Sequence, residues 1–172
     1  PQGRWPKAVA RLGIQAALAQ PQAGDVTINW HGLGPEESYA DSKVAALGGA
    51  WQHSVDQWQT RYTHPQENGA RRGVTRASLG FPDGGGLMLE SGGTTLGHKD
   101  LTGFELTLRP WSDHALADAK HPHELAADGK LWLHLDAGQD GVGSAACGPG
   151  VLPNAQLHAV PVTMHIRLTA QP

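Results

Sequence analysis

Apolar and polar residues alternate along much of the chain, and this period of two is typical of half-buried β-strands. The clearest example is residues 160–169, where Val162, Met164, Ile166 and Leu168 alternate with polar and charged side chains. Clusters of glycine, proline, asparagine and aspartate separate such segments, as expected of turns. The pattern therefore predicts an all-β fold, an antiparallel sandwich or barrel of nine or ten strands.

The predicted strands share this alternation or a β-branched and aromatic composition. In chain order they cover residues 11–19, 26–31, 51–55, 58–62, 71–79, 87–90, 103–109, 130–136 and 160–169. The first two are expected to form a hairpin across residues 20–25, and residues 42–49 are interpreted as a turn with little burial. One short helix is predicted to begin after Ser112, a favourable N-cap, and to end at Ala119.

A glycine-rich segment follows the strongest strand signal, residues 130–136. Residues 140–150 contain four glycines and one proline, a composition that excludes a helix or a regular strand. A loop of small residues at the end of a rigid strand is a common carrier of functional contacts, and an ordinary flexible surface loop has the same composition. Cys147 lies within this segment, but no motif of a cysteine enzyme surrounds it.

Length and charge restrict the class of protein. The 172 residues are expected to form one domain. A formal net charge of -3 and a pI near 6.4 give no basic surface for nucleic acid. No apolar run approaches the ~20 residues of a membrane span, and a single cysteine excludes an internal disulfide framework. Of the six tryptophans, we expect Trp51, Trp58, Trp111 and Trp132 in the core.

Two pairs of residues are candidates for chemistry. Glu36 and Glu37 are adjacent, so in an extended segment they point in different directions and do not form the opposed carboxylate pair of a glycosidase. A structural role is the expectation, with one of the two as a buried hydrogen-bonding anchor. His121 and His123 have the spacing of two zinc ligands on a strand, but no neighbouring motif supplies a third ligand. The alternative is that these histidines bond to backbone or carboxylate groups.

Several motifs follow one another in a specific order and spacing. They are Arg11-Leu12-Gly13, residues 30–41 (WHGLGPEESYAD), residues 65–69 with Arg71 or Arg72, residues 104–109 with Ser112 and residues 114–125, and residues 133–143 ending in Gly148-Pro149. Together they resemble the large β-galactosidases of glycoside hydrolase family 2. Each motif alone is modest, but their common register makes the resemblance specific across nearly the whole chain.

The resemblance implies that residues 1–172 are the last part of the C-terminal small-chain domain of such an enzyme. That domain is an antiparallel β-supersandwich similar to galactose mutarotase. Its front strands, and the TIM-barrel domain with the catalytic glutamates, are expected outside this chain. The full enzyme would hydrolyse terminal β-D-galactosides such as lactose, and this chain alone would be inactive.

The resemblance also implies a role for the glycine-rich segment, which would close one side of the active-site pocket. Ser144, Cys147 and Gly148 are the substrate-binding candidates on this rim. Cys147 lies near the position where some family members have a tryptophan that stacks on the sugar. No catalytic residue and no metal ligand is assigned to this region. No cofactor is expected here, whereas Mg²⁺ and Na⁺ are implied for the full-length enzyme.

The expected partners are a galactoside substrate and further copies of the enzyme, which would form a homo-oligomer in the cytoplasm. Neither nucleic acid nor a membrane is expected as a partner. If front strands are missing, an open sheet edge should remain and promote self-association. Two alternatives stay open, a stand-alone carbohydrate-binding or mutarotase-like sandwich and a purely structural assembly domain.

Overall fold

The computed structural model describes residues 3–20, 22–143 and 150–172. The strands are Arg11–Ala19 (β1), Thr27–Gly34 (β2), Leu47–Ser54 (β3), Arg71–Val74 (β4), Arg76–Gly80 (β5), Gly86–Leu96 (β6), Lys99–Leu101 (β7), Phe104–Arg109 (β8), Lys130–Gln139 (β9) and Val162–Gln171 (β10). The α-helices are Val55–Trp58 (α1) and Asp113–Asp118 (α2), and the 3-10 turns are Ala23–Asp25 (η1), Pro122–Glu124 (η2) and Pro153–Ala155 (η3).

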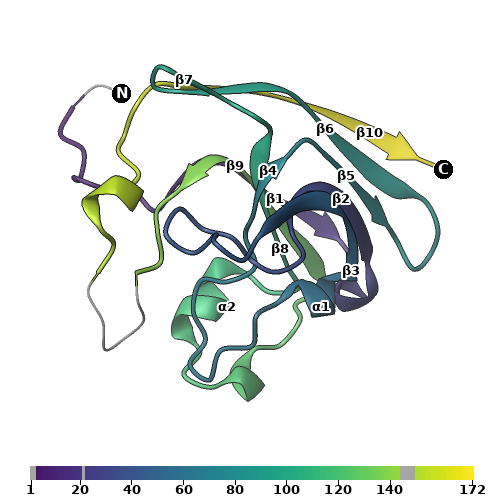
Figure 1. The fold of residues 1–172 in the computed structure, drawn as a ribbon. Coiled ribbons are helices and arrows are strands. Elements are labelled where there is room, and N and C mark those ends of the chain that lie inside the picture. The colour runs from purple at the N-terminus through teal and green to yellow at the C-terminus, as the bar shows by residue number, and fades with distance from the viewer. Residues whose placement is uncertain (1–2, 21, 144–149) are drawn as a thin grey trace.

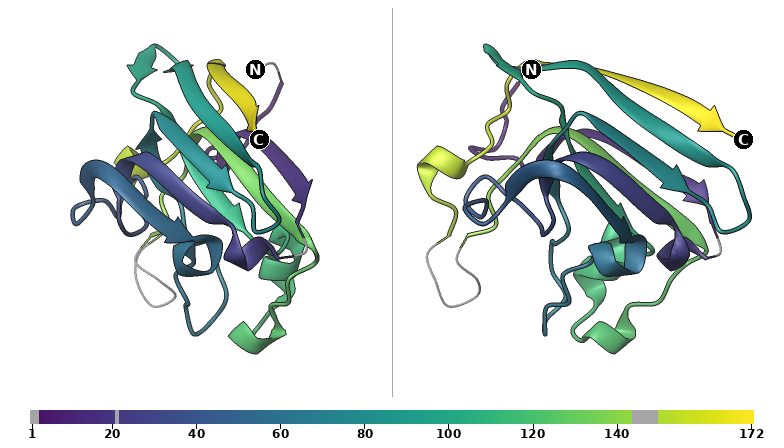
Figure 2. Two further views of the ribbon diagram at one scale, coloured as in Figure 1. Left: turned by 90° about the vertical axis from the view of Figure 1, so that its right-hand side faces the viewer. Right: turned by 45° about the vertical axis from the view of Figure 1, so that its right-hand side comes forward.

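Two antiparallel sheets pack against each other around a common core (Figure 1). Sheet A has four strands in the order β1–β9–β8–β4, and sheet B has the order β10–β6–β5–β2–β3 with β7 paired to β6. Two further views show α1 and α2 at the same end of the sandwich (Figure 2). This arrangement confirms the predicted antiparallel β-sandwich.

The helix predicted after Ser112 is confirmed as α2, where Ser112 Oγ accepts a hydrogen bond from the N–H of Ala115 at 3.2 Å. The expectation of a single helix is wrong, because α1 replaces part of the predicted strand 58–62. Ser54 Oγ accepts from the N–H of Gln57, and the Gln57 side chain accepts from the N–H of Ser54. This capping box starts a helix that ends at the buried Trp58. No helix in the described residues is long and apolar enough to cross a membrane.

The predicted hairpin of the first two strands is also wrong. β1 pairs along its length with β9 in sheet A, whereas β2 lies between β3 and β5 in sheet B. The segment that contains η1 therefore carries the chain from one sheet to the other. Turn-forming residues determine where a strand ends but not which strand it pairs with, and β1 has no fully buried residue that would have favoured one partner.

The predicted strand 71–79 is two strands that belong to different sheets. β4 pairs with β8 in sheet A, and β5 pairs with β2 and β6 in sheet B. At the crossing, the N–H of Thr75 donates to the carbonyl of His31 at 2.9 Å. Two other boundaries differ, because β3 already begins at Leu47 and β6 continues to Leu96. The alternating run thus turns a corner of the sandwich.

The core between the sheets is formed by inward-facing leucines and by two tryptophans that meet edge to face. The ring centroids of Trp30 and Trp58 are 4.7 Å apart with an interplanar angle of 68°. The guanidinium of Arg71, itself buried, lies 4.4 Å from the Trp58 ring centroid. Of the tryptophans expected in the core, Trp58 is fully buried, while Trp51, Trp111 and Trp132 are only partly buried.

Sheet A is buried on both faces at β8 and β9, and its outer face is polar. In β8, Phe104, Leu106 and Leu108 join the core, so the alternating Glu105, Thr107 and Arg109 face outwards. These three side chains are nevertheless buried. A buried polar face on a sheet requires partners for every polar group, and it is therefore the place to look for a site.

Candidate functional site

The polar face of sheet A is built by the register of three neighbouring strands. β8 and β9 place Glu105 opposite Asp136 and Thr107 opposite His134. β1 places Gly13 opposite Asp136 on the other side. Gly13 leaves room for the Asp136 carboxylate, because a Cβ at this position would overlap Asp136 Oδ1 and the carbonyl of Leu135. Polar side chains from distant parts of the chain therefore meet on one surface.

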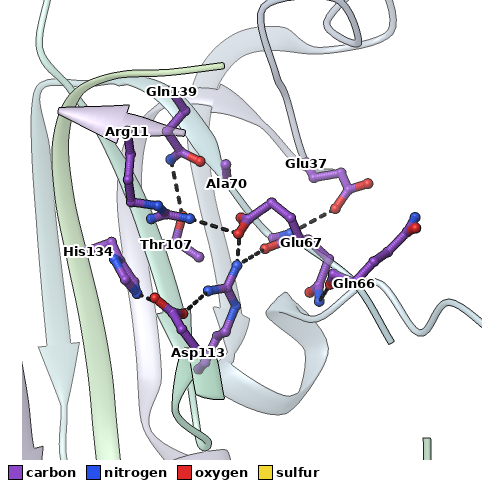
Figure 3. A network of polar contacts seen from close by, with 12 residues as sticks. Arg11, Glu37, Gln66, Glu67, Ala70, Thr107, Asp113, His134 and Gln139 are labelled. Atoms are coloured by element: carbon purple, nitrogen blue, oxygen red, sulfur yellow. Dashed lines mark hydrogen bonds and ion pairs between the residues drawn. The ribbon is translucent and has the colours of Figure 1, made fainter. Parts of the chain in front are cut away.

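Glu67 is the centre of a network of ionic contacts on this face (Figure 3). Its Oε2 accepts from Arg11 at 2.7 Å, and its Oε1 accepts from Arg109 at 2.6 Å and from the hydroxyl of Tyr39 at 3.0 Å. Arg109 is fully buried and also donates to Asp113 at 2.8 Å. Glu67 thus neutralises a guanidinium that has no access to water, a geometry in which the loss of one partner is costly.

Arg11 extends the network to Asp136, to which it donates at 3.0 Å. Burial raises the pKa of Asp136 to about 7, the nearby carboxylates of Glu105 and Glu67 add to this rise, and Arg11 opposes it. Burial also raises the pKa of Glu105, against the opposing effect of Arg72, which donates to it at 2.6 Å. The face therefore holds carboxyl groups that take up protons more readily than in water.

The raised pKa of Asp136 predicts a specific pH dependence of stability. Between the ordinary pKa of aspartic acid near 4 and the folded value of about 7, the folded chain binds more protons at this position than the unfolded chain. The contribution of Asp136 to the free energy of unfolding therefore falls as the pH rises from about 4 to 7. Urea unfolding at several pH values measures this slope. In Asp136→Asn the slope should become less negative across the same window, and an unchanged slope would contradict the assignment.

The network also contains a histidine–carboxylate pair. His134 Nε2 lies 3.2 Å from Asp113 Oδ1, and Gln15 Nε2 contacts both residues at 3.3 and 3.2 Å. The hydrogen bond from His134 lowers the pKa of Asp113 to about 2, with burial opposing. Only 2% of the His134 side chain is exposed, whereas 47% of the Asp113 side chain is, so the imidazole is closed to a ligand and the carboxylate is not. The role of the pair in the described residues is to hold sheet A and α2 together.

A cavity of about 310 Å³ opens beside the network. Its walls come from the start of β1, from the loop that carries Glu67, and from the end of β9 with the residues that follow it. The lining residues are Ala10, Arg11, Gln66, Glu67, Gln139, Asp140, Gly141 and Val142. Figure 3 shows Arg11 between Gln139 and Glu67 in this part of the network. The cavity is thus lined both by the ion pair of Arg11 and Glu67 and by the side-chain amides of Gln66 and Gln139.

The chain after β9 is held at both ends by aspartates. Asp41 accepts from the N–H of Val142 at 3.0 Å and from the N–H of Gly143 at 2.9 Å. Asp140 accepts from the N–H of Leu157 at 2.7 Å. Position 141 requires glycine, because a Cβ there would overlap the Asp41 carboxylate. The wall of the cavity formed by residues 141–143 is therefore positioned by Asp41.

The residues singled out from the sequence have different outcomes. Ser144, Cys147 and Gly148 lie outside the described residues. Glu37 accepts from the N–H of Gly69 at 2.7 Å and from the hydroxyl of Tyr62. These bonds confirm a hydrogen-bonding anchor for one of the two glutamates, but Glu37 is only partly buried.

The histidine rings at positions 121 and 123 stack with centroids 5.5 Å apart. His121 is the N-cap of η2 and His123 lies within it, so neither is on a strand. The described part of the chain contains no group of three or more histidine, cysteine, aspartate or glutamate side chains arranged to hold a metal ion. The carboxylates of the polar face do not fit Mg²⁺, because Glu67, Asp136 and Glu105 are each paired with an arginine.

The ionic network was not predicted from the sequence, although the sequence does show that several of its residues share a strand face. The alternation in residues 104–109 and 131–136 places Glu105, Thr107 and Arg109 on one face of their strand and His134 and Asp136 on one face of theirs. Alternation of this kind is typical of a strand with one solvated face, so the sequence does not show that this polar face is covered. The position of Glu67 has no comparable signal, because it lies on a loop.

Comparison with known proteins identifies the family of this chain. Residues 2–169 match the family model of the β-galactosidase small chain. The chain belongs to the β-galactosidase small-chain family. It is 34% identical over 170 residues to a β-galactosidase of Arthrobacter sp. (strain B7), a match that covers 99% of this chain and 16% of that protein. It is 32% identical over 134 residues to a β-galactosidase of Photobacterium profundum, a match that covers 77% of this chain and 11% of that protein.

The small chain thus spans less than a fifth of the length of these two relatives. The match confirms the resemblance drawn from the sequence motifs. It also means that this small chain belongs to a glycoside hydrolase family whose two cited members are far longer than 172 residues. The polar face and its cavity are features of the small chain itself.

Proposed function

We propose that this small chain is the C-terminal region of a β-galactosidase that hydrolyses terminal β-D-galactosides such as lactose. In this proposal the small chain lines one side of the active-site pocket and supports assembly, and the two catalytic glutamates belong to a TIM-barrel domain outside these 172 residues. Ser144, Cys147 and Gly148 are proposed to form the pocket rim. The family match supports the assignment to a β-galactosidase, and the hydrogen bonds of Asp41 to residues 142 and 143 support a positioned pocket wall.

The state of the carboxylates supports the proposal that the catalytic pair lies elsewhere. A retaining glycosidase needs one carboxylate nucleophile and one carboxylic acid, about 5 Å apart, on either side of the substrate. Asp136 has a raised pKa suited to a general acid, but only 1% of its side chain is exposed and Arg11 binds it. Glu67 is engaged by two arginines and a tyrosine hydroxyl. Neither group is free to attack or protonate a glycoside.

Open strand edges support a role in assembly. β1 and β10 lie at the ends of their sheets, and apolar side chains such as Ile14 and Leu168 are more than half exposed on them. Edges of this kind pair with further strands. We propose that they contact other parts of the polypeptide or another copy in a homo-oligomer. Sedimentation of the isolated chain tests this, because a pure monomer at high concentration would count against it.

The remaining parts of the proposal concern metal ions and location. Mg²⁺ and Na⁺ would bind the full-length enzyme outside the polar face described above, since the carboxylates there are paired with arginines. A cytoplasmic location is proposed on the basis of the single cysteine, which makes no demand for an oxidising compartment. Metal analysis of the purified polypeptide and fractionation of the cells that produce it test these two points.

The contact between Asp41 and residues 142–143 can be removed by mutation, which gives a test of the proposal. In the polypeptide that contains this chain, Asp41→Ala frees two backbone N–H groups and releases the wall that precedes the proposed rim. A misplacement of about 1 Å is expected to lower kcat/KM for galactoside hydrolysis by roughly 10- to 100-fold. Asp83→Ala, in the exposed turn between β5 and β6, is the matched control and should leave kcat/KM unchanged. Equal activity of the Asp41 variant and wild type would remove this segment from the active site.

A further inference from the structure

A second cavity, of about 210 Å³, lies at the end of the sandwich that carries α1 and α2 (Figure 2). One wall comes from residues 56–68, which run from α1 into the loop before β4, and the other comes from residues 111–125, which contain α2 and η2. It is smaller than the cavities of about 300 to 1,000 Å³ that enclose drug-sized molecules. The second cavity therefore admits one small ring, and the rest of a longer ligand would extend out of its opening.

Hydrogen bonds within the chain hold both walls of the second cavity in place. Gln59 Nε2 donates to the carbonyls of Val55 at 3.0 Å and Leu108 at 2.7 Å, which fixes the first wall to β8. His64 Nδ1 lies 3.2 Å from the carbonyl of Lys120, a contact that joins the first wall to the second. The second cavity is thus formed before a ligand enters, which lowers the cost of binding.

Most of the lining is apolar, and two aromatic side chains contribute to it. Trp111 and Tyr62 line the second cavity together with Pro65, Leu116 and Leu125. Both aromatic side chains are partly exposed, whereas Leu116 is buried beneath them. An indole ring offers a flat apolar surface with a polar N–H at its edge. The lining therefore suits a ring-shaped ligand that has an apolar face.

Polar groups of the lining have hydrogen-bonding capacity left. Arg61 uses Nη2 for both carboxylate oxygens of Asp56, at 2.8 and 2.9 Å, and its Nε and Nη1 have no partner among the described residues. The indole N–H of Trp111 is buried and also lacks a partner there, although buried donors are normally paired. An oxygen of a ligand can supply that partner after a small shift of the side chains that cover the indole.

The charges of the lining balance, which favours a neutral ligand. Asp56 and Arg61 are the only acidic and basic residues among the described residues that line the second cavity, and they pair with each other. An ion of either sign would have to compete with this pair. The other charged side chains around this end also have neighbours of opposite sign: Glu67 with Arg11 and Arg109, Glu37 near Arg71, and Glu124 beside Lys120.

We propose that the second cavity binds one pyranose ring of a neutral saccharide. The C–H face of the ring lies on Trp111, and its hydroxyl groups, which both donate and accept, bond to Arg61 and Asp56. An apolar ring would leave these polar groups unused, and an open-chain polyol would have no face to place on the indole. The proposal goes beyond the proposed function, because it adds a saccharide site formed by residues 56–68 and 111–125.

The test is a titration of the 172-residue chain, labelled with ¹⁵N and confirmed as β-rich by circular dichroism. The probes are methyl β-D-galactopyranoside and methyl β-D-glucopyranoside. The NMR signal of the Trp111 indole N–H, assigned by its loss in Trp111→Phe, should shift with at least one of them and saturate with a dissociation constant on the order of 1 mM. Sorbitol and cyclohexanol are the control ligands, one with hydroxyls but no ring and one with a ring but a single hydroxyl, and both should bind more weakly.

Two variants test the named contacts, with binding followed by the backbone amide signals of Thr60 and Leu125. Trp111→Ala removes the platform and should raise the dissociation constant about tenfold. Arg61→Ala removes an exposed side chain, so the fold is preserved, and should raise it about three- to tenfold, the effect of one hydrogen bond. Arg76→Ala, which removes an exposed arginine near Glu90 on sheet B, is the matched control and should leave it unchanged.

Several results would overturn the inference. They are the absence of saturable shifts with both pyranosides, tighter or equal binding of sorbitol or cyclohexanol, and an Arg61→Ala chain that binds as tightly as wild type. The proposed function is tested separately, by hydrolysis of 4-nitrophenyl β-D-galactoside by the longer polypeptide that contains this chain. Hydrolysis without binding at Trp111 rejects only the inference, and binding without hydrolysis rejects only the proposed function.

Discussion

Replacing Glu67 by alanine is expected to lower the free energy of unfolding by about 3 kcal/mol, the lower end for the loss of one partner of a buried ion pair, because Arg109 is fully buried while 35% of the Glu67 side chain is exposed. The substitution removes an acceptor from Arg11, from the fully buried Arg109 and from the Tyr39 hydroxyl. In this variant Arg109 still donates to Asp113 and to the carbonyl of Asn68. It loses the negative charge that Glu67 supplies from the loop before β4. Urea unfolding at pH 7.0 (~25 °C) measures the loss.

An exposed ion pair provides the control for this prediction. Asp56 binds Arg61 through both carboxylate oxygens at 2.8 and 2.9 Å, but 59% and 72% of the two side chains are exposed. Asp56→Ala should therefore cost less than about 1 kcal/mol. A Glu67 variant that is no less stable than the Asp56 variant would show that the network does not stabilise the polar face.

Replacing Gly13 by alanine is expected to lower the free energy of unfolding by roughly 3 kcal/mol, the upper part of the range for overpacking. The added Cβ would overlap Asp136 Oδ1 and the Leu135 carbonyl, and would lie 2.6 Å from the Cα of Asp136. Backbone atoms cannot move aside as a flexible side chain does, so β1 must separate from β9 or the Arg11–Asp136 contact must break. Urea unfolding reports the loss of stability.

The matched control is another strand glycine with open space around it. Gly48 in β3 has no heavy atom within 4 Å of an added Cβ. Because glycine in a strand loses more conformational freedom than alanine, Gly48→Ala should raise the free energy of unfolding by about 0.5 kcal/mol. If both alanine variants have the same stability, the close approach of β1 to Asp136 does not constrain the fold.

The class of fold follows from the sequence because strand alternation is a local property. β8, β9 and β10 carry alternation strong enough to locate them, and Ser112 caps α2 as expected. Strand partners are not local. Nothing in residues 20–25 distinguishes a hairpin from a crossing to the other sheet, and the observed partner of β1 is β9, more than 100 residues away in sequence. The Ser54–Gln57 capping box was a readable helix signal within a stretch that otherwise alternates.

The site was less predictable than the fold. The charged residues of β8 and β9 have a period-two signal, but their partner Glu67 comes from a loop some 40 residues away in sequence from Arg109. Asp41 acts on residues that are 101 and 102 positions away. Contacts of this kind depend on how loops cross the surface of a completed sandwich. Motif resemblance located the family, whereas the three-dimensional arrangement was needed to find the cavity.

The most direct test of this account measures whether the isolated 172-residue chain cleaves a galactoside. The chain, confirmed as β-rich by circular dichroism, is assayed with 4-nitrophenyl β-D-galactoside beside the longer polypeptide that contains it. The account predicts hydrolysis by the longer polypeptide and none above the buffer rate by the isolated chain. Hydrolysis by the isolated chain that disappears in Asp136→Asn would contradict it, because the buried, arginine-bound carboxylates would then be the catalytic ones.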